Sequence, residues 1–80
     1  MAQIELHSKD FSQILRAAPQ IVRFPAKQMW LDYDAEADVL YINFKKPSHA
    51  TDSELTDNDI IVRYEGEAVI GLTVLHASTR

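Results

Sequence analysis

The first patterned stretch of the chain has the apolar spacing of an amphipathic helix. Its apolar residues recur at intervals of three and four, which would place them on one helix face: Phe11, Ile14, Leu15 and Ala18. Asp10 can cap an unpaired amide at the start, with Gln13 three residues later as in a capping box. Pro19 lacks an amide proton and disfavours helical angles at the residue before it. The pattern predicts a helix of about two turns, which must pack on the rest of the chain to be stable.

The residues on either side of this helix predict extended backbone. Ile4–Leu6 alternates in polarity as a short strand does. Residues 20–28 contain an apolar run that is interrupted by Pro25. Because proline cannot donate a hydrogen bond to a sheet, any strand there is short or lies at an edge.

From residue 29 onward the pattern is that of strands separated by polar turns. Runs rich in β-branched and aromatic residues occupy 29–33, 39–44, 60–64 and 69–75. The polar loop Asp34–Asp38 joins the first two runs, and a turn at Gly66, which is free to adopt positive φ, joins the last two. The polar stretch 45–59 contributes no predicted strand. We expect an α+β fold: a four-stranded antiparallel sheet of two hairpins, with a short N-terminal helix packed on one face.

Both faces of this predicted sheet carry apolar side chains. Successive strand residues face opposite sides, and one predicted strand is apolar on both: Val39 and Tyr41 on one side, Leu40, Ile42 and Phe44 on the other. A single short helix can cover only one face. The second cover is either the segment 21–24 or another copy of the chain, and we favour a homodimer.

Residues 33–42 read Tyr-Asp-Ala-Glu-Ala-Asp-Val-Leu-Tyr-Ile. This string resembles the opening signature of a prokaryotic family of short proteins, domain of unknown function 2283. The acidic stretch after it and the run Val69–Leu72 are also similar to that family, so the resemblance covers residues 29–80. It implies a small antiparallel sheet domain over 29–80, with segment 1–28 as a helical and extended addition found in a subset of members. Some members are encoded beside small RelE-like toxins, which implies an antitoxin-like or immunity-like role.

Length, composition and charge narrow the class of protein. Eighty residues, 46% of them apolar and 25% charged, make one soluble domain, and the chain has no cysteine for a disulfide or a thiolate zinc site. The N-terminal residues are too charged for a signal peptide, and no apolar stretch could span a membrane, so we expect a cytoplasmic protein without a membrane partner. Residues 1–28 carry a net charge of +2 and residues 29–80 one of −6. This balance disfavours nucleic acid and suits a basic protein partner or simple solubility.

Three alternating carboxylates in the first hairpin loop are the candidate metal ligands: Asp34, Glu36 and Asp38. Their spacing is that of the first half of a calcium-binding EF-hand loop, but Val39 and Lys45 stand where that loop needs glycine and glutamate. We therefore predict a turn whose carboxylates accept hydrogen bonds from loop amides, and no specific calcium site. The alternative is a sheet protein that binds a small molecule or a divalent metal through this loop.

A second acidic run supplies the candidate partner-binding residues: Asp52, Glu54, Asp57 and Asp59. It is either a solvated linker or a docking patch for a basic protein. Tyr41 joins these candidates as an aromatic residue on the second apolar face. The other aromatic residues could stack on bases, but so few basic residues lie between them that a core or an interface role is favoured.

The arrangement of polar residues predicts neither catalysis nor a cofactor. His7, His49 and His76 are far apart and lack metal-ligand spacing. His49, Asp52 and Ser53 are residue types of a catalytic triad, but they share one polar loop without an oxyanion-hole donor. The sequence therefore predicts a non-enzymatic, dimeric protein-interaction module, with an antitoxin-like role as its specific form.

Overall fold

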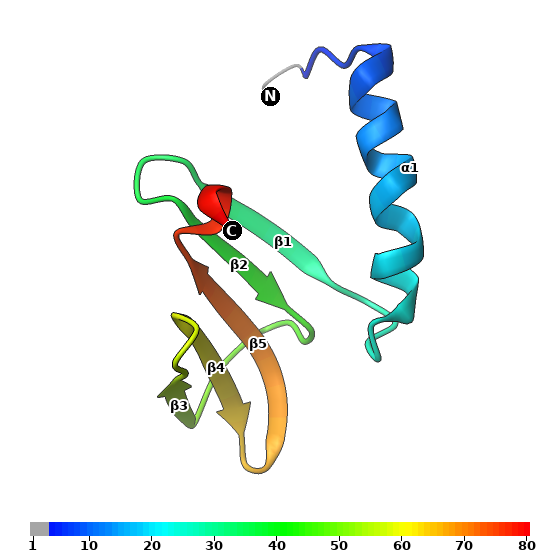
Figure 1. Ribbon diagram of the computed structural model, residues 1–80. Coiled ribbons are helices and arrows are strands. Elements are labelled where there is room, and N and C mark those ends of the chain that lie inside the picture. Colours follow the sequence, from blue (N-terminus) through cyan, green and yellow to red (C-terminus); the bar gives the residue numbers. More distant parts are fainter. Residues whose placement is uncertain (1–3) are drawn as a thin grey trace.

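Five strands form one antiparallel sheet in the computed structural model, which describes residues 4–80 (Figure 1). Along the chain the elements are α1 (Ser8–Arg23), β1 (Trp30–Asp34), β2 (Val39–Asn43), β3 (Asp52–Leu55), β4 (Ile60–Glu65), β5 (Ala68–Leu75) and a 3-10 helix, η1 (Ala77–Thr79). The strand order is β1-β2-β5-β4-β3. After β2 the chain crosses to the far edge, where it forms β3, and then returns through β4 to β5, which pairs with β2. The predicted α+β class is confirmed.

Both predicted hairpins are present. β1 pairs with β2, and β4 pairs with β5 through a turn in which Gly66 has a φ of 62°. In the first loop, Asp34 Oδ1 accepts hydrogen bonds from the amides of Glu36 and Ala37 at 3.1 and 3.2 Å. Asp38 closes that loop with a φ of 56°, a conformation that aspartate adopts more readily than most other residues.

The prediction of four strands is wrong by one. β3 lies in the stretch expected to be a linker, and it pairs with β4 from Asp52↔Tyr64 to Leu55↔Ile61. Its four residues are exposed, and the two acidic ones are poor strand formers, so neither alternation nor propensity indicates a strand. The strand is formed by its backbone pairing with the half-buried strand β4, and not by its own side-chain pattern. Its acidic side chains also discourage further pairing at this edge.

The helix is longer than predicted. Its N-cap is His7, whose backbone amide donates to the Asp10 carboxylate at 2.8 Å, so Asp10 acts inside the first turn and not as the cap. The helix continues through Pro19 to Arg23, and the segment after the proline is helical where extended backbone was expected. Proline removes one helix hydrogen bond, and the residues that follow resume the same turn. Ile4–Leu6 is not a strand.

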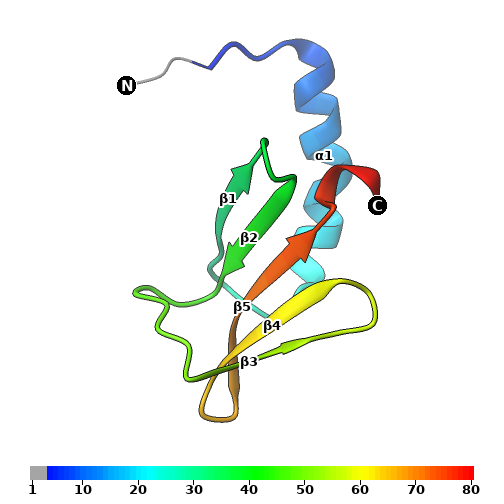
Figure 2. The ribbon, with the colours of Figure 1, turned by 90° about the vertical axis from the view of Figure 1, so that its left-hand side faces the viewer.

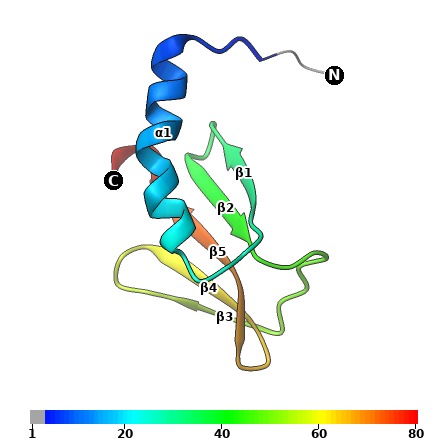
Figure 3. The same ribbon diagram turned by 90° about the vertical axis from the view of Figure 1, so that its right-hand side faces the viewer.

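α1 does not pack over the sheet as predicted. It stands to one side of the sheet, behind it in Figure 2 and in front of it in Figure 3, and none of its residues is buried. Within residues 4–80 the buried apolar side chains are those of Val39 and Ile70, and Thr73 is the buried polar one. The sheet alone therefore supplies the small core.

The chain is extended for its length. The Cα radius of gyration is 14.2 Å, against about 12 Å for a compact chain of this size. Its accessible surface is 6715 Å², whereas a folded monomer of 9.1 kDa exposes about 4,900 Å². Eight of the thirteen exposed large apolar residues lie between Ile4 and Phe24, and the other five lie on the strands. No helix within residues 4–80 has the length and apolar character that a membrane crossing requires.

Candidate interaction surface

One face of the sheet is apolar across four strands. Cross-strand partners share a face, and the register places eight residues on the side toward α1: Leu31 and Tyr33 of β1, Leu40 and Ile42 of β2, Leu72 and Val74 of β5, and Ile60 and Val62 of β4. We call this set the helix-side face. Leu31 is 58% exposed, Tyr33 is also exposed, and the other six residues are only half-buried. A single copy of the chain therefore leaves this face incompletely covered.

α1 carries a matching apolar surface, which we call the helix stripe. Its residues recur every three or four positions and so lie on one side of the helix: Phe11, Ile14, Leu15, Ala18, Ile21 and Val22. Leu15 is 73% exposed and Val22 is 79% exposed. The spacing in the sequence predicted the first four of these residues only. The missed signal is that Ile21 and Val22 continue the same period beyond the proline.

A groove opens between the C-terminal end of α1 and the helix-side face. Its volume is about 550 Å³, and its walls include Ile21 and Phe24 on one side and Leu31, Leu40 and Ile42 on the other. Because most of these side chains are apolar, the groove suits an apolar occupant better than a charged one.

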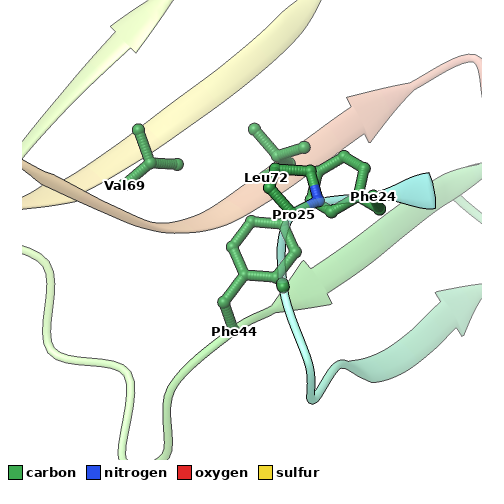
Figure 4. A pocket seen from close by; sticks show the side chains of 6 residues that line it. Phe24, Pro25, Phe44, Val69 and Leu72 are labelled. Atoms are coloured by element: carbon green, nitrogen blue, oxygen red, sulfur yellow. The ribbon is translucent and has the colours of Figure 1, made fainter. Parts of the chain in front are cut away.

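The segment after α1 is anchored to the sheet at one point. The rings of Phe24 and Phe44 stack with centroids 5.2 Å apart and planes inclined by 27°. Pro25, Val69 and Leu72 lie around the same shallow pocket (Figure 4). This contact holds the C-terminal end of α1 next to the sheet. The last turn of α1 is therefore the part of the helix that lies near the strands.

The opposite face of the sheet has a polar centre. Arg63 of β4 reaches across Gly71 of β5 and donates from Nη2 to Asn43 Oδ1 on β2. A Cβ atom at Gly71 would lie 2.8 Å from Arg63 Cζ and 3.0 Å from Asn43 Oδ1, so glycine makes room for this bridge. Tyr41, one of the candidate partner-binding residues, is paired with Thr73 on this face and is 38% exposed. It does not belong to the helix-side face.

The four acidic candidates lie along one edge of the sheet. Asp52 and Glu54 belong to β3, Asp57 and Asp59 belong to the loop between β3 and β4, and all four residues are exposed. Arg80 donates a hydrogen bond to the backbone carbonyl of Asp59 at 3.2 Å, which ties this loop to the C-terminus. The structure thus gathers these acids on an ordered strand and its adjoining loop.

The three candidate metal ligands lie in the turn between β1 and β2. Asp34 caps loop amides, and Glu36 is exposed. Asp38 accepts hydrogen bonds from the Tyr33 hydroxyl at 2.6 Å and from the amide and hydroxyl of Ser78 at 3.0 and 2.8 Å. The bonds from Tyr33 and then Ser78 lower the pKa of Asp38, and the same bond to Asp38 raises the pKa of Tyr33. Residues 4–80 contain no cluster of three or more side chains placed to hold a metal ion.

Comparison with known families supports the resemblance seen in the sequence. A family model described as "Protein of unknown function (DUF2283)" matches residues 30–78, which is more than half of the chain. The chain belongs to the DUF2283 family. The DUF2283 match begins at the first strand and ends in η1, so α1 lies outside it. No curated protein and no solved structure matches the chain.

The DUF2283 segment also contains the residues that resembled a catalytic triad. His49 lies in the loop before β3, and Asp52 and Ser53 begin that strand. In the described part of the chain no hydrogen bond links His49 to either residue, whereas the Asp52 carboxylate accepts one from the Ser53 amide at 2.8 Å. His76 is the N-cap of η1 and has a φ of 53°.

Proposed function

We propose that this chain is a non-enzymatic protein-interaction module that works as a homodimer. The main support is the solvent-accessible surface area: one chain exposes about 1,800 Å² more than a compact chain of its mass. Obligate homodimers bury about 1,000 to 2,500 Å² on each partner. The excess surface of one chain is therefore of the size that a homodimer covers.

The chemistry of that surface supports the same proposal. The helix-side face and the helix stripe are both apolar, and contiguous exposed apolar patches mark interaction sites in soluble proteins. A chain of 80 residues without cysteine also has few other means of stabilising its fold. Association with a second copy would supply the core that one copy lacks.

The acids of β3 and its loop support a basic protein as the further partner. Residues 29–80 carry a net charge of −6, and Asp52, Glu54, Asp57 and Asp59 remain exposed along one edge. Complementary charge speeds the encounter with a basic surface. An antitoxin-like module that binds a small basic protein in the cytoplasm is the specific form of the proposal.

Analytical ultracentrifugation at micromolar concentration tests the dimer. We expect a mass of about 18 kDa, twice the chain mass of 9.1 kDa. Leu31→Asp, on the helix-side face, should raise the dimer dissociation constant at least about tenfold, since a buried charge costs more than the roughly 1.4 kcal/mol that tenfold represents. Leu55→Asp is the matched control, because Leu55 is as exposed but lies on the opposite face. A wild-type monomer, or equal effects of the two variants, would contradict the proposal.

A further inference from the structure

We propose that two copies of the chain exchange their helices, so that α1 of each copy covers the helix-side face of the other. This inference rests on the proposed homodimer and adds which surfaces meet. Both surfaces are present in every chain and both are apolar; in the chain alone the helix stripe is mostly exposed, and the helix-side face is only half-buried apart from the exposed Leu31 and Tyr33.

The dimensions of α1 fit the surface that needs cover. Its 16 residues make a helix of about 24 Å at 1.5 Å per residue. Five strands spaced by about 4.8 Å span about 19 Å from the first to the fifth. The stripe itself, from Phe11 to Val22, is about 17 Å long, which is enough to cross the four strands of the helix-side face, about 14 Å wide.

The anchor at Phe24 explains why the cover comes from another copy. Phe24 stacks on Phe44, and from that point α1 runs alongside the sheet (Figure 3). Leu15 and Val22 on this helix are exposed. Laying α1 on its own sheet would require the anchored segment to change direction. The α1 of a second copy can contact the helix-side face without this change of direction, because the second copy can approach as a whole in the required orientation.

Two-fold symmetry closes this arrangement. When the helix stripe of one copy contacts the helix-side face of the other, the two-fold rotation forms the equivalent contact between the remaining stripe and face. Both stripes and both faces are then covered. Such a dimer ends at two chains, whereas head-to-tail contacts would continue into a filament.

Charge favours the same pairing. Lys9, Arg16 and Arg23 recur every seven residues and so form one row on the polar side of α1, away from the stripe. The exchanged helix thus brings a segment of net charge +2 onto a body of net charge −6 while its basic side chains stay in solvent. The basic α1 of one copy is therefore attracted to the acidic sheet of the other, although each whole copy carries a net charge of −4.

Cysteine cross-linking of the full chain tests the exchange, since the natural sequence contains no cysteine. One variant carries Leu15→Cys with Leu31→Cys, and a second carries Leu15→Cys with Ile60→Cys. The two variants sample β1 and β4, the outermost strands of the helix-side face. The control carries Gln13→Cys, on the polar side of α1, with Leu31→Cys. A short thiol-reactive cross-linker is applied at micromolar protein, the products are weighed by mass spectrometry, and each variant is sedimented before reaction.

We expect at least one stripe variant to give a covalent dimer, about tenfold faster than the control, because contact in the dimer raises the effective thiol concentration. A sedimenting dimer without excess covalent dimer from either stripe variant would overturn the exchange and leave the proposed homodimer standing. A sedimenting monomer, including one with an internal cross-link, would overturn both.

Discussion

At the scale of single residues, Asp38 links the first hairpin to the C-terminus. Its carboxylate accepts hydrogen bonds from Tyr33, five residues earlier, and from Ser78, forty residues later. The sequence predicts that acids in this turn accept hydrogen bonds, and Asp34 does so from nearby amides. The bond to Ser78 was beyond prediction, because local patterns carry no information about contacts between distant parts of a chain.

This link makes stability depend on pH in two windows. The pKa of Asp38 is lowered in the folded chain, so its contribution is present above the unfolded pKa of about 3.9 and is lost as pH falls through the folded value. The pKa of Tyr33 is raised, so its contribution is present below about pH 10 and is lost as pH rises through the folded value.

Urea unfolding at a series of pH values checks both windows. Asp38→Asn should flatten the acid window, because the lowered carboxyl pKa is gone. Tyr33→Phe should flatten the alkaline window and also reduce the acid one, because the Tyr33 bond is the largest cause of the lowered Asp38 pKa, while the bonds from Ser78 remain. The interpretation fails if the Asp38→Asn profile coincides with that of the wild type below about pH 4.

At the scale of elements, α1 and β3 show where sequence patterns succeed and fail. The helix stripe follows from spacing alone, but Pro19 was given too much weight as an end signal, although Ile21 and Val22 keep the helical period. β3 gave no comparable signal, since its acidic residues are unlike those of typical strands. Its strand geometry comes from pairing with β4, which only the assembled sheet provides.

Pro19→Ala tests whether the proline weakens a continuous helix. Alanine restores the missing amide, so residues 20–23 should exchange their amide protons more slowly and helical circular dichroism should increase. The local gain is at most about 3 kcal/mol, the cost of an interior proline relative to alanine. Pro25→Ala, beyond the helix end, is the control and should leave these signals unchanged. Faster exchange at residues 20–23 would contradict the continuous helix.

At the scale of the whole molecule, charge is divided between a basic helix and an acidic sheet. The sequence predicts this division, and the structure shows that the acids of β3 and its loop lie along one exposed edge. Rim charges of this kind set association rate and salt dependence more than complex lifetime. The acidic edge should therefore act in the approach of a basic partner.

Surface-based binding kinetics against the partner recovered with a tagged chain check this role. Asp57→Asn with Asp59→Asn should slow association several-fold at low salt and reduce its salt dependence, while the dissociation rate stays near that of the wild type. Asparagine also tolerates the positive φ of 59° at Asp59, so the fold should be unchanged. Asp32→Asn, on the opposite edge strand, is the control. Equal association rates for the two variants would reject the acidic edge as the docking surface.

The scarcity of buried side chains in one copy has a consequence for turnover. A lone chain keeps its apolar sheet face accessible, and partly open chains of this kind are the ones that proteases degrade. If pairing supplies the missing cover, the paired fraction rises with concentration, and the folded state gains stability in proportion to the logarithm of the partner's level. Half-life would then increase with expression. A fall in synthesis would shorten the survival of the molecules already made, which would let the amount of this protein drop quickly.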